Sequence, residues 1–192
     1  MKKIELEIVA LSHSITQTNS YAVVLGEVNG LRKLPIVIGG FEAQAIAVAL
    51  ERMKPTRPLT HDLMKNFMMA FNIDLHEVII SDLQEGIFYS KLLCSSESDT
   101  VEIDSRTSDA LALAVRFGCP IYIYENIFDV AGVENPETEE VPVNQVTEAS
   151  SVRQDLKSMS LDELTNLLND VLEQEDYIRA IAIRDEINAR KR

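Results

Sequence analysis

The chain has 192 residues, 46% of them hydrophobic, which is enough for one domain of ordinary size with a real core and an appendage. It carries 18 basic and 31 acidic residues, a formal net charge of −13, whereas nucleic-acid-binding proteins usually show a basic surface. The composition therefore excludes a broad basic surface for polyanions. Any phosphate must be held by a local site or through metal ions.

The opening segment does not have the pattern of a targeting signal. Glu5 and Glu7 interrupt the apolar run that a secretory signal needs, and no later stretch reaches the roughly 18 apolar residues of a membrane span. Cys94 and Cys119 form no ligand cluster or disulfide framework, and they suit the core of a protein in a reducing compartment. We expect a cytoplasmic protein that does not interact with membranes.

Hydrophobic periodicity predicts an alternation of strands with three helices. Asn29-Gly30 and Gln84-Glu85-Gly86 are predicted turns, and Thr60 is the predicted N-cap of the second helix. The third helix opens at Asp104-Ser105 and has no polar side chain from Ala110 to Val115, so it must be covered on all sides. The predicted strands are 3–11, 21–28, 34–38, 75–83, 87–95 and 100–104, with a further strand after the third helix that reaches Tyr124, and the first two predicted helices are 42–52 and 61–71.

Residues 38–50 and 103–115 align with an offset of 65 residues. Both stretches contain a strand end, a polar hinge and a helix that is apolar at nearly every position, and two more strands precede each of them. Residues 1–132 are therefore predicted to form a duplicated β-β-β-α unit of the α+β class, with mixed or antiparallel sheets around two buried helices. If the duplication is real, the two helix N-termini are pseudo-symmetry mates and should converge. Alternatively, two alanine-rich buried helices share this pattern through packing alone.

The chain changes character after residue 132. Residues 133–155 are acidic and contain prolines without an apolar period, which is typical of a flexible linker. Residues 156–192 are predicted to form an α-helical hairpin that a capping box at Ser160 and Glu163 opens. A hairpin of this size cannot bury both apolar stripes by itself. It should pair with the same hairpin in another subunit, with another protein or with the main domain, and we expect a homo-oligomer.

Three stretches carry a resemblance to the bifunctional nuclease domain family. They are LPIVIGGFEAQAIA (34–47), RPLTHDL (57–63) and DSRTSDALALAVRFGCPIY (104–122). The resemblance covers about the first 130 residues, and it implies an α+β domain associated with cleavage of both DNA and RNA. It does not by itself assign the catalytic residues.

The tail at 168–187 resembles the UVR motif, the helical hairpin at which excision-repair nuclease subunits B and C interact. This sequence departs from the motif at Ile178, where a Glu is usual, and at Val171-Leu172, where small residues are common. The resemblance implies protein binding. The residues that carry it are Asp176, Tyr177, Ala180, Arg184, Asp185 and Ile187, and the predicted protein-binding residues are Tyr177, Ile181, Arg184 and Ile187.

Hydrolysis of a phosphodiester needs stabilisation of phosphate charge, an activated water and commonly carboxylates that hold a divalent metal. Arg106 is the candidate phosphate clamp, His61 the candidate base and Asp109 a candidate catalytic carboxylate. Arg106, Ser105, Gly39 and Gly40 are candidate substrate-binding residues at helix N-termini, and the candidate ligands of Mg²⁺ or Mn²⁺ are Asp104, Asp109, Glu42 and Asp62.

Each candidate also has a purely structural interpretation. Asp104 can be an N-cap, and Arg106 and Asp109 can simply pair at i and i+3. Glu42 and Asp62 can be first-turn acids, and His61 can be an exposed first-turn residue. Two functions therefore compete. The chain is either a metal-assisted nuclease for DNA or RNA with a protein-interaction hairpin, or a non-catalytic scaffold or ligand-binding domain that acts through the hairpin.

Overall fold

The computed structural model describes residues 2–13, 20–97, 99–134 and 159–173, together with the single residues 180, 183, 184, 186, 187 and 190. Contacts along the chain separate two compact units, Met1–Pro136 and Glu137–Arg192. Within the described ranges, no helix is both long enough and apolar enough to cross a membrane.

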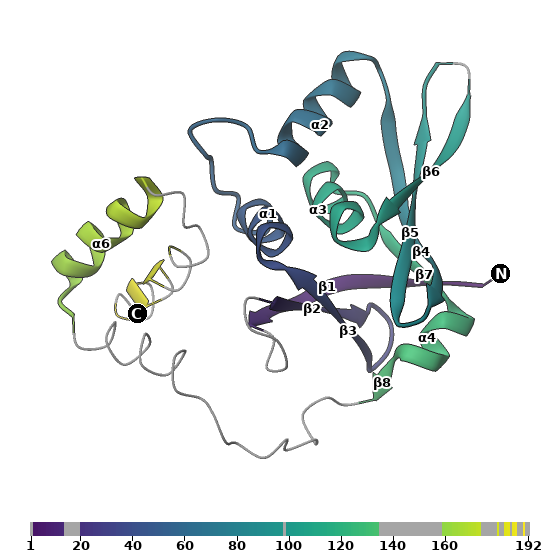
Figure 1. The fold of residues 1–192 in the computed structure, drawn as a ribbon, viewed down its shortest axis with the longest axis horizontal. Coiled ribbons are helices and arrows are strands. Elements are labelled where there is room, and N and C mark those ends of the chain that lie inside the picture. The colour runs from purple at the N-terminus through teal and green to yellow at the C-terminus, as the bar shows by residue number, and fades with distance from the viewer. Residues whose placement is uncertain are drawn as a thin grey trace. The chain divides into compact units, whose positions relative to one another are not determined.

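The first unit is built on one mixed sheet, which in the described residues has the strand order β6-β5-β4-β7-β1-β2-β3-β8 (Figure 1). Neighbouring strands are antiparallel except for β4 and β7, which are parallel. The strands are β1 (Lys3–His13), β2 (Ser20–Glu27), β3 (Arg32–Gly39), β4 (Asp74–Gln84), β5 (Ile87–Ser95), β6 (Thr100–Arg106), β7 (Ile121–Tyr124) and β8 (Val133–Glu134), and the helices are α1 (Gly40–Leu50), α2 (Thr60–Ala70), α3 (Thr107–Phe117) and α4 (Glu125–Ala131).

The predicted duplication is confirmed by this topology. The succession β1-β2-β3-α1 is repeated as β4-β5-β6-α3, with α2 between the copies and β7 closing the second copy. The central strand β7 has β4 on one side and β1 on the other, so the two three-strand arms extend outward from it. The bounds of the two helices differ from the prediction, because α1 begins two residues earlier, at Gly40, and β6 continues to Arg106 before α3 begins.

The two repeated helices form the centre of the core. Figure 1 shows α1 and α3 side by side over the same side of the sheet. Four consecutive residues are buried at equivalent positions in each helix, 45–48 and 110–113, as the 65-residue offset predicts. Many of these residues are alanines, and small side chains let helix axes approach closely. The strand β3 supplies the layer below with alternating buried residues, Leu34, Ile36 and Ile38.

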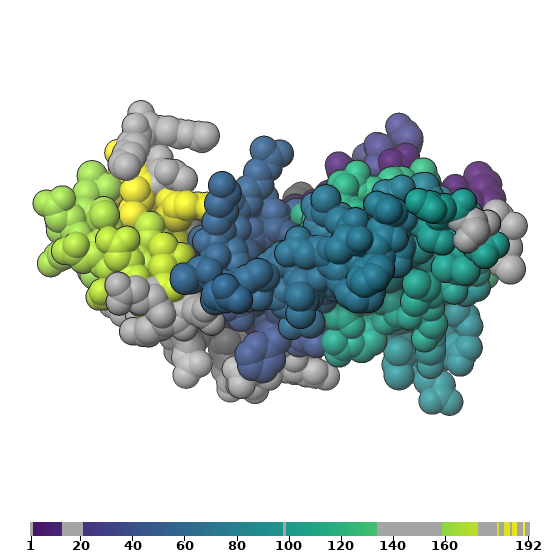
Figure 2. Space-filling model, turned by 90° about the horizontal axis from the view of Figure 1, so that it is seen from above, coloured from purple at the N-terminus to yellow at the C-terminus, as the bar shows by residue number. Residues whose placement is uncertain are grey.

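The inserted helix α2 covers α3 and lies at the surface of the first unit, in blue in Figure 2. Its outer side chains include Leu63 and Phe67, and Phe71 is its C-cap; these three side chains are 53 to 63% exposed. The predicted N-cap was wrong, because Thr60 is the first helical residue and Leu59 is the N-cap. The carboxylate of Asp62 takes the capping role, since its Oδ2 accepts a hydrogen bond from the Leu59 N–H at 2.9 Å.

Glycines with positive φ occupy the hairpin turn between β4 and β5 and the C-terminal end of α3. Glu85 and Gly86 form a two-residue hairpin loop between the paired residues Gln84 and Ile87, and both have positive φ, 51° and 81°. This is the geometry of a type I′ turn, for which glycine is favoured. Gly118 ends α3 with φ 68°.

In the second unit the described residues include helix α6 (Leu161–Glu173). Its predicted capping box is confirmed, because the Ser160 N–H donates to Glu163 Oε2 at 2.7 Å and the Glu163 N–H donates to Ser160 Oγ at 3.3 Å. Apolar side chains on both sides of residues 174–179 are buried, and they are Leu164, Val171, Ala180, Ile183 and Ile187. Most of the predicted linker, residues 135–155, and the predicted contacts Tyr177 and Ile181 lie outside the described residues.

Candidate functional site

The start of α3 is anchored to the sheet by a buried hydroxyl. Thr107 Oγ1 donates a hydrogen bond to the Phe88 carbonyl of β5 at 3.0 Å, and it lies 2.8 Å from Ser90 Oγ, which is also buried. Because Thr107 uses its hydrogen on the carbonyl, Ser90 is the donor in the second bond. The two bonds hold the residues on either side of Thr107 in place.

Arg106 and Asp109 form a two-point ion pair across this helix start. Arg106 Nε donates to Asp109 Oδ2 at 2.7 Å, and Nη2 donates to Oδ1 at 3.2 Å. The third guanidinium nitrogen, Nη1, donates to Glu42 Oε1 of α1 at 3.0 Å. The two helix N-termini therefore converge through these side chains, as the duplication predicted. The Arg106 side chain remains 69% exposed, so the ion pair lies at the surface and not under packed apolar groups.

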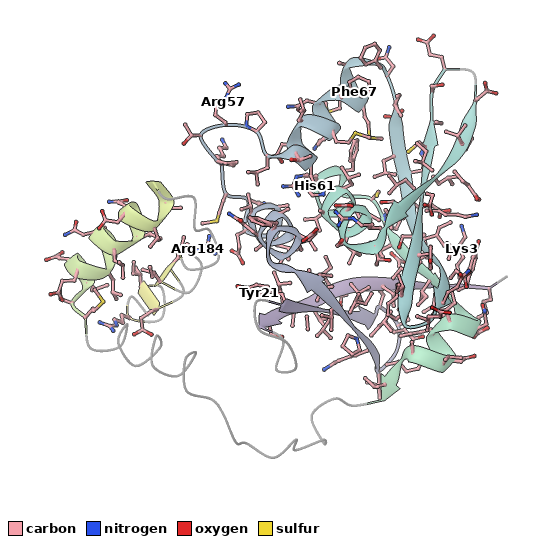
Figure 3. All side chains as sticks on the ribbon, in the orientation of Figure 1. Lys3, Tyr21, Arg57, His61, Phe67 and Arg184 are labelled. Atoms are coloured by element: carbon pink, nitrogen blue, oxygen red, sulfur yellow. The ribbon has the colours of Figure 1, made fainter. Side chains whose placement is uncertain are left out.

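His61 reaches the same carboxylate from α2. Its Nε2 lies 3.0 Å from Asp109 Oδ1, and its side chain is only 15% exposed, so the interpretation of His61 as an exposed residue was wrong. Figure 3 shows His61 at the beginning of α2, on the side that faces α1 and α3. We name the group of Glu42, His61, Arg106 and Asp109 the helix-start cluster.

The state of Asp109 decides which atom of His61 carries hydrogen. Burial raises the pKa of Asp109, but the hydrogen bonds from Arg106 and His61 outweigh burial and hold the pKa below its ordinary value. The carboxylate is therefore ionised near neutral pH and can only accept hydrogen bonds. Nε2 of His61 must be the donor, which leaves Nδ1 as the basic nitrogen of the neutral ring.

The predicted substrate-binding glycines lie at the junction of β3 and α1. Gly39 is the N-cap of α1 and Gly40 is its first residue. The Glu42 side chain folds back over them, because a Cβ atom on Gly39 would lie 2.4 Å from Glu42 Oε2. A carboxylate already occupies the position near this helix start that a bound anion would take, so a phosphate here must displace Glu42.

Two predicted residues at the hinge have other roles. Asp104 belongs to β6, where it lies opposite Lys91 in the ladder, so the N-cap interpretation was wrong. Arg106 is the N-cap of α3 instead, without a side-chain capping bond. Ser105 lies beside the helix-start cluster, and its Oγ donates to the Arg106 carbonyl at 3.0 Å.

The four predicted metal ligands do not meet at one point. Among the residues that the structure describes, no three His, Cys, Asp or Glu side chains gather in an arrangement that could hold a metal ion. The Arg106 guanidinium bonds to both Glu42 and Asp109, while Asp62 binds Arg116 Nε at 2.6 Å and Asp104 extends from the sheet edge strand. This arrangement of donors does not fit a metal centre.

The role of Arg116 was not predicted from the sequence. It lies in the last turn of α3, and its side chain is only 5% exposed. Besides the bond to Asp62, its Nη1 donates to the carbonyls of Ala45 at 3.0 Å and Ala112 at 2.9 Å. A single charged residue near the end of an apolar helix was the only available signal, and that pattern usually describes a solvated helix end.

Comparisons with known proteins agree with the resemblance in the sequence. The model of the bifunctional nuclease domain matches residues 23–136. An uncharacterized protein of Mycobacterium tuberculosis is 40% identical over 148 residues, which cover 76% of this chain and 88% of that protein. Bifunctional nuclease 1 of Oryza sativa subsp. indica is 25% identical over 97 residues, or 49% of this chain and 29% of the rice protein.

The family match covers most of the first compact unit and ends where that unit ends, at residue 136. It includes all four residues of the helix-start cluster. It does not reach the tail, so the likeness of the tail to the UVR motif stays a prediction. The chain belongs to the bifunctional nuclease domain family.

Proposed function

We propose that the first unit hydrolyses phosphodiester bonds of nucleic acid at the helix-start cluster. The observation that carries the proposal is the hydrogen-bonded pair of His61 and Asp109 beside the exposed guanidinium of Arg106. A base oriented by a carboxylate and a cation for a phosphate are two of the groups that this hydrolysis needs. Membership of a nuclease domain family supports the same chemistry.

His61 would activate the water. Nδ1 takes a proton from the water as its oxygen attacks phosphorus, and the opposite P–O bond breaks. Solvent water protonates the oxygen that leaves on the far side, and Nδ1 returns its proton to solvent. Asp109 holds the ring through Nε2 and stabilises the imidazolium while it carries the additional proton. No step of the proposal passes through a metal ion.

Arg106 would bind the phosphate. A guanidinium offers paired N–H groups that match phosphate oxygens and stabilise the charge that develops on them. In the structure three of the five N–H groups bond to Glu42 and Asp109, so a phosphate either uses the remaining two or displaces a carboxylate. Glu42 is the group more easily displaced, because it makes one bond to Arg106 whereas Asp109 makes two.

An exposed aromatic ring favours nucleic acid over other phosphodiesters. Phe41 precedes Glu42 in α1, and it is 87% exposed. Bases stack on such rings with about 1–3 kcal/mol each, regardless of sequence. With a net charge of −13, this acidic chain must rely on such local contacts, because it has no excess of cations to attract the backbone.

The test is cleavage of single-stranded DNA and RNA by purified protein, with and without EDTA. Arg106→Ala, Asp109→Asn and His61→Gln should each lower kcat/KM by at least about a hundredfold, because each removes a group that acts in the transition state. Lys91→Ala is the matched control, since it removes an exposed cation of β5 that pairs with Glu102 outside the cluster.

Contaminating nuclease is controlled by purifying every variant by the same procedure. Cleavage that persists equally in the three cluster variants would contradict the proposed site. Loss of cleavage in EDTA would show that the active form recruits a metal ion that this arrangement of donors does not hold.

A second function is favoured by the bonds that Arg106 already makes to carboxylates. All three guanidinium nitrogens already have carboxylate partners, which is also the pattern of an ion-pair network that only joins helices. On this alternative the first unit is a scaffold or ligand-binding domain, and the UVR-like tail binds a protein partner or a second copy of the chain. The alternative would be supported if the wild-type protein cleaves neither DNA nor RNA but binds a partner through its tail.

A further inference from the structure

Arg116 connects the three helices that supply the helix-start cluster. It belongs to α3, and its Nε donates a hydrogen bond to Asp62 of α2. Its Nη1 donates to two carbonyls, that of Ala45 in α1 and that of Ala112 in α3. Lys65 of α2 adds a fourth link, because its Nζ donates to the carbonyl of Arg116. The connection lies in the interior, since the Arg116 side chain is 5% exposed.

This arrangement is a costly way to stabilise a helix interface. Nη2 of Arg116 is buried and has no hydrogen-bond partner in the structure. An unsatisfied buried donor is unfavourable, and apolar residues of similar volume often replace a buried ion pair without loss of stability. The bonds of Arg116 do, however, fix direction and distance, which apolar packing does not do to the same degree.

Each link of Arg116 ends close to a member of the cluster. Asp62 is the residue after His61, and its other oxygen holds the Leu59 N–H at the start of α2, so the first turn of α2 is held from both sides. Ala45 lies three residues after Glu42 on α1, which places the two on adjacent turns. Arg116 itself lies two turns after Asp109 on α3.

We propose that Arg116 is a positioning residue that sets His61 at hydrogen-bonding distance from Asp109 by fixing α1 and α2 against α3. Its effect on catalysis rests on the proposed function, whereas its effect on the geometry of His61 does not. A shift of about 1 Å in a reacting group can lower a rate a hundredfold. Arg116 touches no substrate in this proposal and acts only through the helices.

The test follows the hydrogen on His61 Nε2 by proton NMR of full-length protein labelled with ¹⁵N in histidine. A bond to an ionised carboxylate protects this hydrogen from exchange and moves its signal downfield. The signal is assigned by its loss in His61→Gln. In Arg116→Met the signal should broaden or disappear, and kcat should fall about tenfold to a hundredfold with little change in KM, because Arg106 is retained.

Asp62→Asn is a second variant, in which the side chain keeps nearly the same shape. It allows the same test if Arg116→Met fails to fold. It removes the charge that Arg116 binds, and it should weaken the His61 signal in the same direction. Arg116→Lys keeps a cation but cannot reach three helices with one planar group, so its signal should lie between those of Arg116→Met and the wild type.

Arg32→Met is the matched control. Like Arg116, Arg32 is in an ion pair, with Nε 3.0 Å from Glu27 Oε2, although its side chain is only half-buried. It lies at the start of β3, at the opposite end of that strand from Gly39, which corresponds to about 23 Å at 3.3 Å per residue. Arg32→Met should cost stability while the His61 signal and kcat stay at wild-type values.

The outcomes separate the two proposals. A folded Arg116→Met or Asp62→Asn protein that keeps the protected His61 signal would overturn the positioning role, whatever its activity. If the signal disappears while wild-type cleavage proves independent of His61, the positioning role stands and the proposed catalytic site fails. If signal and kcat fall together in these variants and not in Arg32→Met, both proposals are supported.

Discussion

Asp109 is the residue on which the charges of the cluster converge. It accepts hydrogen bonds from Arg106 and His61 together, and these bonds lower its pKa despite partial burial. Without its carboxylate, Arg106 would retain only the single bond to Glu42 and His61 would lose its orienting acceptor. Asp109 therefore links the phosphate-binding group to the base.

The lowered pKa of Asp109 predicts a stability that depends on pH. Folding favours the ionised carboxylate, so the contribution is present above the ordinary pKa of 3.8 and is lost as pH falls through the lower folded pKa. The difference in unfolding free energy between wild type and Asp109→Asn should therefore be largest above about pH 5 and shrink below about pH 4. Urea unfolding across this range measures it, and a difference that stays constant would contradict the assignment.

Phe41 tests whether a base stacks beside the cluster. Phe41→Ala should raise KM for single-stranded substrates about tenfold, because a stacked base contributes about 1–3 kcal/mol. Phe41→Trp should retain or lower KM, since it keeps an aromatic face. Leu31→Ala is the control for loss of an equally exposed apolar side chain, as Leu31 is 88% exposed. An equal KM in Phe41→Ala and wild type would remove the ring from the site.

At the scale of elements, the junction of β6 with α3 matters most. The strand ends and the helix begins between Arg106 and Thr107, so a residue of the sheet and a residue of the helix meet in one ion pair. The buried bonds of Thr107 to β5 set the angle at which α3 leaves the sheet. The polar hinge is therefore both a structural joint and a part of the candidate site.

Thr107→Val tests this joint with a change that keeps the shape of the side chain. It should lower the unfolding free energy by about 1–3 kcal/mol, because Ser90 Oγ and the Phe88 carbonyl lose their buried partner. It should also lower kcat by displacing Arg106 and Asp109. Thr107→Ser keeps the hydroxyl and should lose far less activity, and denaturant unfolding with a cleavage assay distinguishes the two variants.

At the scale of the whole molecule, the chain consists of two units, and the family match lies in only one of them. The first unit contains the family match and the cluster, and the second contains the capped helix α6 and the UVR-like segment. The acidic excess is shared by both parts, with −6 up to residue 132 and −7 after it. Neither part therefore has an excess of cations that would attract a nucleic-acid backbone.

Deletion of residues 150–192 tests whether the units are independent. The remaining chain should keep its fold and its hydrolysis, because the cluster lies within the first unit, and it should lose a binding partner or an oligomer. Circular dichroism and cleavage measure the first expectation, while light scattering and pull-down measure the second. Unfolding of the truncated chain would show that the tail belongs to the core of the main domain.

The sequence by itself determined the class, the duplicated order of elements and the glycine turns, because these depend on local periodicity and on backbone conformations that few residues adopt. It also selected Arg106, Asp109, His61 and Glu42 as candidates, since polar residues at helix starts stand out against apolar helices. Tertiary structure alone decided which of them meet. Asp104 and Asp62 have the same local signals as Asp109, and the signal of Arg116 is that of a solvated helix end. Only the packing of α1, α2 and α3 therefore separates a shared site from an ordinary cap.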